Sequence, residues 1–356
     1  MNQLNTKKIV SALFALSLSA CTSIPKDGGL SNVNSLVETK LSAGVQLPSL
    51  SHNNQLTADA MLSLLAQPLS IADAEKLAVE FNPMMKVKLF KVGLAEADYA
   101  QAGRMENPGF SYARVSGQAY EASLLFDMGG VILMPLKRQL EKRRLQSARY
   151  QAASDVLEHI ANTRRGWINA VAAKQQTALM LKTLESAEAG NNLTRQMSAL
   201  GHSSVIEAAD SEIFLSGMRT SLTRQRLAES AAREGLIRQL GLWGQQARSL
   251  KLPDRLPELP PNSIDIESVE GQAIENRLDV RMANMNIEGL AKNLKLTRLN
   301  PFFSAIELGP VMEKGEGEIN RGYELEFRIP IFDTGDIKTQ KAKAIYDQAQ
   351  AQAEVT

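Results

Sequence analysis

The sequence has little of what stabilises a small secreted domain. Among its 356 residues there is one cysteine, Cys21, so an intrachain disulfide framework is excluded and stability must come from packing and assembly. Aromatic residues make up only 5% of the chain, whereas apolar residues reach 44%, and much of that content is Ala and Leu. This composition favours long, closely packed helices over a compact aromatic core.

The chain also lacks an excess of charge and any catalytic motif. It has 40 Lys and Arg against 39 Asp and Glu, a net charge of +1, so nucleic acid is a poor candidate partner. There is no G-x-S-x-G, no H-E-x-x-H and no phosphate-binding glycine loop. The histidines, His52, His159 and His202, are far apart and have no ligand-spaced neighbours. The sequence therefore predicts no enzyme, no cofactor and no metal site.

The longest apolar run near the N-terminus is shorter than a membrane-spanning helix. Lys7 and Lys8 precede the run from Ile9 to Leu18, and residues 1–20 have the layout of a secretory signal. The run falls short of the roughly 20 residues that a transmembrane helix needs. Residues 18–21 resemble a bacterial lipobox, in which the thiol of Cys21 receives a diacylglycerol. An ordinary cleavage site that precedes a cysteine is the alternative.

The rest of the chain is predicted to be a tether followed by two repeats. Residues 21–68 are rich in Ser, Asn, Gly and Pro, which is typical of a flexible tether. A helix is predicted from Ser70, a residue that caps helices, with breaks at Asn82-Pro83 and Asn107-Pro108. Two motifs recur after about 194 residues. We therefore expect a first repeat over 69–250 and a second over 251–356, each with a helix, a strand pair and a helix.

Short alternating segments predict the strands. Residues 323–329 alternate apolar and charged side chains, and residues 120–127 do so less strictly. We place strand pairs within 108–134 and 300–332. Transmembrane barrel strands need only about ten tilted residues, with one apolar face toward lipid and one polar face toward water. The edge of a soluble sandwich would give the same alternation.

A long helical hairpin is predicted over 135–244. Apolar residues recur at steps of four and seven after Pro135 and continue to about Leu200, which corresponds to about 98 Å of helix. The basic residues between 137 and 144 are predicted either to meet lipid phosphates or to form a solvated helical face. The segment Leu200, Gly201, His202, Ser203 and Ser204 makes the turn, with positive φ at Gly201 and a helix cap at Ser204.

These features, in this order, resemble the outer-membrane efflux protein family, whose best-known member is TolC. The resemblance covers residues 69–356 and rests on Asn82-Pro83, Asn107-Pro108, the turn at Gly201 to Ser204, Leu240-Gly241, Asn300-Pro301 and the segment 328–335. The last motif is the most specific, because the family has a strand-to-helix corner there. Such a corner needs a proline (Pro330), a buried aromatic (Phe332), a cap (Asp333 or Thr334) and a glycine (Gly335).

The resemblance implies a mainly α fold with short transmembrane β-strands. Three subunits would form a homotrimer with a long α-helical hairpin barrel and a twelve-stranded β-barrel, four strands from each subunit. It also implies a passive export duct in the outer membrane, lipid-anchored and extending into the periplasm, that serves efflux or type I secretion. The duct would reach an inner-membrane transporter through a periplasmic adaptor, and Leu200, Gly201, Ser203 and Ser204 would form the adaptor contact.

By the repeat, a second long hairpin should follow Gly335. The helical pattern there stops at Thr356, so we expect that the second helical hairpin is missing. Two alternatives stay open: a structural lipoprotein that spans the periplasm without a pore, and a non-functional truncated member of the family. The repeated strand pair favours the duct, because a strut has no need of amphipathic strands at both equivalent positions.

Overall fold

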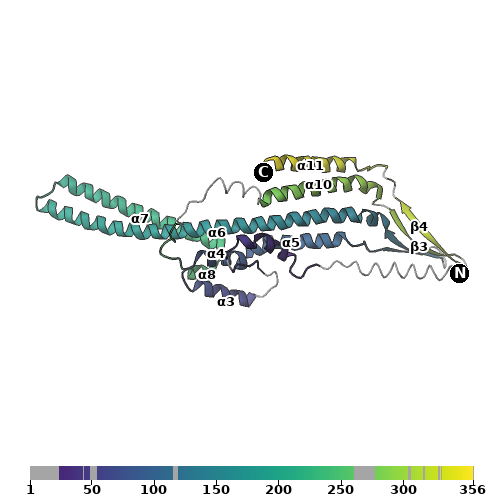
Figure 1. Cartoon of the computed structure of the whole chain (residues 1–356), viewed down its shortest axis with the longest axis horizontal. Coiled ribbons are helices and arrows are strands. Elements are labelled where there is room, and N and C mark those ends of the chain that lie inside the picture. Colours follow the sequence, from purple (N-terminus) through teal and green to yellow (C-terminus); the bar gives the residue numbers. More distant parts are fainter. Residues whose placement is uncertain are drawn as a thin grey trace. The chain divides into compact units, whose positions relative to one another are not determined.

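The computed structural model describes residues 24–42, 44–48, 54–114, 119–259, 277–303, 306–315, 317–327, 329 and 331–355. The signal segment, Cys21 and Pro330 lie outside these residues. The chain divides into two compact units, and each is described by itself (Figure 1). Unit 1 comprises Met1–Val33, Phe90–Ala153 and Ala273–Thr356, and unit 2 comprises Asn34–Leu89 and Ser154–Gln272.

Unit 1 contains one antiparallel sheet in which the two predicted strand pairs join. Its strands are β1 (Gly109–Arg114), β2 (Tyr120–Asp127), β3 (Ile306–Lys314) and β4 (Ile319–Phe327). They lie in the order β1-β2-β3-β4, so β1 and β4 form the two edges. The prediction of a mainly helical chain with four short strands is confirmed. The helices of this unit are the C-terminal part of α5 (Pro83–Ala102), the start of α6 (Met128–Ala199), α10 (Leu278–Phe303) and α11 (Asp336–Val355).

Each side of the sheet has its own chemistry, as the alternation predicts. Register pairs Leu325 with Leu308 and Leu308 with Phe126, so apolar residues share one side across three strands. We call this side the apolar face. The other side, the polar face, has Glu121 directly opposite Glu313 and Glu307 directly opposite Glu326. Directly paired side chains point to the same side of a sheet, so the segregation extends over the whole sheet.

Two predicted boundaries in unit 1 are wrong. Residues 128–134, predicted as strand, belong to α6, because the Asp127 carboxylate accepts the N–H of Gly130 at 2.7 Å and caps the helix early. Pro135 then lies inside α6, and Pro301 lies inside α10, so the second strand pair begins at Ile306 and not at residue 300. A proline removes one backbone hydrogen bond and bends a helix, but the remaining residues of a long helix keep theirs.

The prediction of a flexible tether over 21–68 is wrong for its helical parts. This segment contains α2 (Leu30–Val37), a short 3₁₀ helix, η1 (Glu38–Lys40), and α3 (Asn54–Leu65). Val33, Val37 and Leu65 are buried. Apolar side chains at steps of three and four were present among the polar residues, and that spacing gives one buried helical stripe.

Unit 2 is a helical hairpin with a small helical core at its base. The helices are α4 (Ile71–Lys76), η2 (Leu77–Phe81), the rest of α6, α7 (Val205–Leu240) and α8 (Gly244–Ser249), together with α3. The indole N–H of Trp167 donates to the carbonyl of Leu69 at 2.8 Å, and Leu69 donates to the carbonyl of Lys251 at 2.9 Å. These bonds fix the segment before α4, whose start at Ser70 is confirmed by a hydrogen bond from the N–H of Asp73. The core comprises Met61, Leu65, Leu69, Leu77, Trp167, Val171, Leu236, Leu240 and Leu250.

The two hairpin helices are long and return as predicted. Helix α6 has 72 residues, which corresponds to about 108 Å at 1.5 Å per residue, and α7 has 36. Helix α7 ends at Leu240, and the residue that caps it, Gly241, has a φ of 69°. Within the described ranges, no helix is at once long and apolar enough to cross a membrane.

Candidate functional site

The turn between α6 and α7, which we call the hairpin tip (residues 196–206), is built from two helix caps. Gly201 has a φ of 78°, as predicted. The N–H of His202 donates to the carbonyl of Met197 at 2.8 Å, and that of Gly201 donates to the carbonyl of Ser198 at 3.0 Å. This pair of bonds is the Schellman motif, which closes a helix through a left-handed residue.

The other half of the tip is a capping box. The hydroxyl of Ser204 accepts the N–H of Glu207 at 3.1 Å, and the Glu207 carboxylate accepts the N–H of Ser204 at 2.9 Å. Ser203 donates from its hydroxyl to the carbonyl of Thr194 at 3.3 Å. The predicted cap at Ser204 is confirmed, and the turn has a defined backbone.

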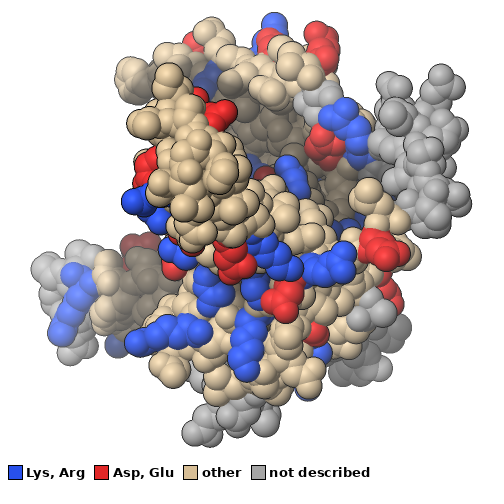
Figure 2. Space-filling view, turned by 90° about the vertical axis from the view of Figure 1, so that its left-hand side faces the viewer, with Lys and Arg blue, Asp and Glu red and all other residues tan. Residues whose placement is uncertain are grey.

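The surface of the tip is apolar and uncharged. Residues 196–206 include no Lys, Arg, Asp or Glu, and Leu200, Val205 and Ile206 are 74%, 80% and 74% exposed. Figure 2 looks onto this end of the hairpin, where mostly uncharged side chains face the viewer. Exposed apolar side chains grouped at one place are typical of a protein-binding surface.

The predicted strand-to-helix corner is partly correct. Gly335 has a φ of 77°, and a Cβ added there would lie 2.4 Å from Cγ of Pro301, so glycine is required at this position. Asp333 accepts the N–H of Gly335 at 3.0 Å and lies 2.5 Å from Nζ of Lys338. The hydrogen bond from Lys338 is the main cause that lowers the pKa of Asp333 below its ordinary value.

The expectation that Phe332 is buried is wrong for the single chain. Its side chain is fully exposed in the segment between β4 and α11. The Asp333 carboxylate accepts one hydrogen bond from the N–H of Gly335, just before α11, and one from Lys338 in the first turn of that helix. It therefore stabilises both the bend and the start of α11.

A buried amide in unit 2 joins three helices, although its sequence context, Asn82-Pro83, marks it only as a helix break. Asn82 is 3% exposed. Its Nδ2 donates to the carbonyl of Gln239 at 2.8 Å and lies 3.2 Å from Nε2 of His159, while its Oδ1 accepts the N–H of Met84 at 2.9 Å. Asn82 thus connects the start of α5 with α6 and the end of α7. Gly241 is required beside it, since a Cβ there would approach the Asn82 side chain to 2.9 Å.

His159 is held neutral by this arrangement. Burial is the first cause that lowers its pKa from the ordinary 6.5, and the charge of Lys88 is the second. A neutral ring accepts from the Asn82 amide through Nε2, which a protonated ring cannot do. His159 is therefore a structural residue with an acid-sensitive hydrogen bond.

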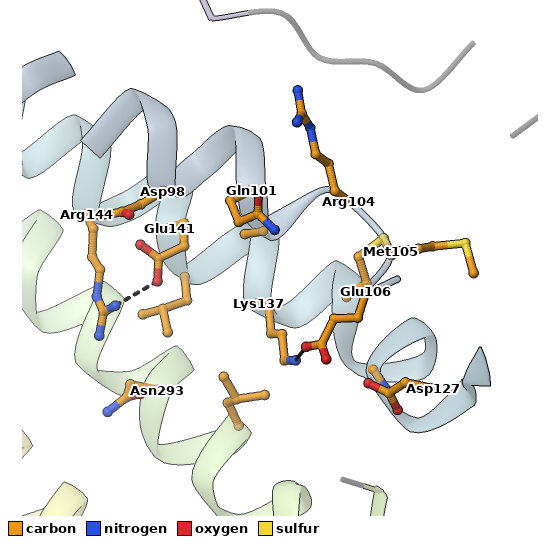
Figure 3. Close-up of a pocket in the computed structure, with 15 residues that line it drawn as sticks. Asp98, Gln101, Arg104, Met105, Glu106, Asp127, Lys137, Glu141, Arg144 and Asn293 are labelled. Atoms are coloured by element: carbon orange, nitrogen blue, oxygen red, sulfur yellow. Dashed lines mark hydrogen bonds and ion pairs between the residues drawn. The ribbon is translucent and has the colours of Figure 1, made fainter. Parts of the chain in front are cut away.

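A pocket of unit 1 has several charged side chains in its lining, and some of them pair with one another. It has a volume of about 540 Å³ and lies between α5, α6 and α10. In Figure 3, Arg144 bonds Glu141 and Lys137 reaches Glu106, at 2.7 and 4.0 Å, whereas Arg104 points away from the other side chains. Among the residues that the structure describes, no group of three or more His, Cys, Asp or Glu side chains is placed to hold a metal ion.

The basic residues between 137 and 144 mostly have protein partners. Besides Lys137 and Arg144, Arg143 pairs with Glu288 at 2.9 Å and Arg138 lies 5.4 Å from the ring of Tyr99. These contacts favour the interpretation as a satisfied helical face over that of a lipid-phosphate site.

No protein-family model matches the sequence, and no curated protein matches it. Solved structures do match. A membrane protein from Pseudomonas aeruginosa is 17% identical with a TM-score of 0.63, over 80% of this chain and 72% of that chain. The CmeC outer membrane channel of Campylobacter jejuni is 14% identical with a TM-score of 0.65, over 80% and 66%.

A third match extends over more of the chain. The outer-membrane channel OprN is 15% identical with a TM-score of 0.62, over 94% of this chain and 75% of that chain. At such identities the likeness is one of fold. The predicted fold is thereby confirmed: the chain has the fold of the TolC-like outer-membrane channels.

Proposed function

We propose that the protein is an outer-membrane channel subunit that serves as a passive export duct. The observation that carries this proposal is the sheet, which has one face of exposed apolar residues and two edge strands, β1 and β4, at opposite ends of the strand order. An open edge presents backbone N–H and C=O groups without hydrogen-bond partners, and such groups are strongly unfavourable in the hydrocarbon core of a membrane. Pairing of β4 with β1 of another copy removes both edges.

A homotrimer is the assembly that we propose. Three copies of a four-stranded sheet give twelve strands, a size at which a closed barrel has room for a lumen. The exposed apolar face then contacts lipid and the polar face lines the interior. The protein conducts solutes and performs no chemistry of its own.

The hairpin tip is proposed to bind a periplasmic adaptor, through which the duct reaches an inner-membrane transporter. The exposed, uncharged side chains at Leu200, Val205 and Ile206 support this role. The corner formed by Pro330, Phe332, Asp333 and Gly335 is proposed to set the path from barrel strand to helix. We further propose that Cys21 carries a lipid anchor, for which mass spectrometry of the N-terminal peptide is the test; an unmodified thiol contradicts it.

The channel proposal is tested with two arginine substitutions on β4. Leu325→Arg places a charge on the apolar face, and Asn320→Arg places the same charge on the polar face of the same strand. A charge on a lipid-facing side costs about 2–4 kcal/mol at mid-membrane, and one facing water costs little. We expect the first variant to lose detergent-resistant trimers and single-channel conductance, and the second to keep both.

Other outcomes would contradict the duct. If both variants conduct like the unsubstituted chain, the assignment of the faces is wrong. If the unsubstituted chain reaches the membrane as a stable protein without conductance, the alternative of a structural, non-channel lipoprotein is favoured.

A further inference from the structure

The positive charges of the sheet gather at one end of its apolar face. Register aligns Arg114 with Tyr120 and Tyr120 with Lys314, in the last row before the two strand turns. Arg321 is paired with Met312, one row further from the turns. Since neighbouring strands lie about 4.8 Å apart, Arg114 and Lys314 are separated by about 10 Å. We call these three side chains the cationic end.

No carboxylate offsets these charges. The Asp and Glu residues of the four strands lie on the polar face. Within the described residues, no ion pair involves Arg114, Lys314 or Arg321. Nζ of Lys314 lies 5.9 Å from the centroid of the Tyr120 ring, which stacks on Tyr112 at 5.9 Å. The ammonium group of Lys314 therefore lies over an aromatic pair, and all three cations are available to an anionic partner.

An apolar groove of about 450 Å³ adjoins the cationic end. It is lined by Phe110, Leu124, Pro310, Met312 and Tyr323, with Arg321 also part of the lining. Two local features of the sheet lie beside the groove. Pro310 lacks an N–H, and the β2–β3 register skips Leu124 and Leu125, which would be opposite Pro310 and Gly309. The small side chain of Ala122 leaves further space beside Met312.

We propose that the groove and the cationic end together bind a phosphate-bearing lipid, with an acyl chain in the groove and the phosphate at Arg114, Lys314 and Arg321. An apolar lining favours a hydrocarbon chain, and guanidinium and ammonium groups without an ion-pair partner favour an anion. Phosphate is an anion that arginine binds through two parallel hydrogen bonds. An amphiphile with both parts joined satisfies both requirements. This inference rests on the proposed function, in which the apolar face contacts the membrane.

The test counts lipids retained on the purified full chain in detergent by native mass spectrometry. The probe is phosphatidic acid, compared with phosphatidylcholine, diacylglycerol and inorganic phosphate. The charge variant is Arg114→Gln/Lys314→Gln/Arg321→Gln. Its control is Lys182→Gln/Arg224→Gln/Arg226→Gln, which removes as many cations from the helical hairpin.

A second pair of variants tests the groove without changing charge. Ala122→Leu fills the groove, and Ala113→Leu makes the same change on the opposite face of the sheet. We expect the charge variant and Ala122→Leu each to weaken retention of phosphatidic acid by about tenfold or more, and both controls to leave it unchanged. Diacylglycerol and inorganic phosphate should compete poorly.

Three results would overturn the proposal: equal retention in the charge variant and its control, equal retention in Ala122→Leu and Ala113→Leu, or competition by inorganic phosphate as strong as that by the lipid. The last result would indicate a site that binds phosphate without any contribution from the acyl chain. Lipid binding is measured in detergent, and channel function is measured by conductance. A negative result for lipid binding can therefore be told apart from a negative result for the channel.

Discussion

At the scale of single residues, the side chain of Asn82 holds distant parts of unit 2 together. Its three hydrogen bonds connect parts of the chain that lie 2, 77 and 157 positions away. Asn82→Ala leaves the carbonyl of Gln239 and the N–H of Met84 without these partners in a buried place. Because each unsatisfied buried group costs about 1–3 kcal/mol, we expect a loss of about 2–4 kcal/mol in the free energy of unfolding.

Urea denaturation followed by circular dichroism measures this loss. Asn192→Ala, on the exposed side of α6, is the matched control, and we expect it to change the free energy of unfolding by less than about 0.5 kcal/mol. Equal midpoints for the two variants would contradict the role of Asn82.

His159 gives the fold a dependence on pH. Its pKa in the folded chain is lowered, so below about pH 6.5 the unfolded chain binds more protons than the folded one. This contribution to stability is fully present above pH 6.5 and is lost as the pH falls from there through the folded pKa. We expect the urea midpoint to fall between pH 7 and pH 5, and His159→Gln to flatten that slope.

The exposed His202 provides the comparison for this titration. His202→Gln should retain the slope of the unsubstituted chain. If His159→Gln keeps the full slope as well, other groups, and not His159, are responsible for the acid sensitivity.

At the scale of elements, the hairpin tip depends on one backbone conformation. No atom lies within 4 Å of a Cβ added at Gly201, so a substitution there acts only through its positive φ. Gly201→Val should cost about 1 kcal/mol or more and distort the turn. We expect it to weaken adaptor crosslinking while membrane insertion stays intact.

Gly190→Val is the control for the tip, since Gly190 lies within α6 and also has no atom near an added Cβ. Crosslinking that falls equally in both variants would point to a general effect on the hairpin. Unchanged crosslinking in Gly201→Val would mean that the adaptor binds elsewhere.

Elements whose causes are local were predictable from the sequence. The caps at Ser70 and Ser204 and the left-handed glycines at Gly201 and Gly335 depend on residues within a few positions. Local signals also gave a wrong start for α6. The helix was predicted to begin at Pro135, but Asp127 caps it earlier in the chain.

Features that depend on distant residues were not predictable. The partners of Asn82 are far along the chain, and nothing local marks them. The cationic end likewise depends on two strand registers, that of β1 with β2 and that of β2 with β3, which together bring Arg114 and Lys314 into one row. A one-residue shift of that register would place Lys314 on the other face.

At the scale of the whole molecule, the charge of the polar face predicts ion selectivity. Its strand residues include Glu121, Asp127, Glu307, Glu313, Glu324 and Glu326, and within the four strands no Lys or Arg lies on that side. In the proposed trimer this face lines the lumen, where carboxylates attract cations. We expect a reversal potential in a potassium chloride gradient that indicates preference for potassium.

Charge-removing variants test the origin of that preference. Glu121→Gln/Glu313→Gln should shift the reversal potential toward zero, and Glu188→Gln/Glu212→Gln in the hairpin should shift it less. Preference for chloride in the unsubstituted channel would contradict the assignment of the polar face to the lumen.

The two caps at the hairpin tip determine what kind of contact can form there. The backbone groups of Met197, Ser198 and Ser204 already have partners within the turn, so we expect a bound protein to contact mainly the exposed side chains of Leu200, Val205 and Ile206. Such a contact lacks long-range attraction between charges, so association should proceed at the unsteered rate of about 10⁵–10⁶ M⁻¹s⁻¹. It should also be nearly indifferent to ionic strength, and strengthen with warming near room temperature as entropy-driven association does.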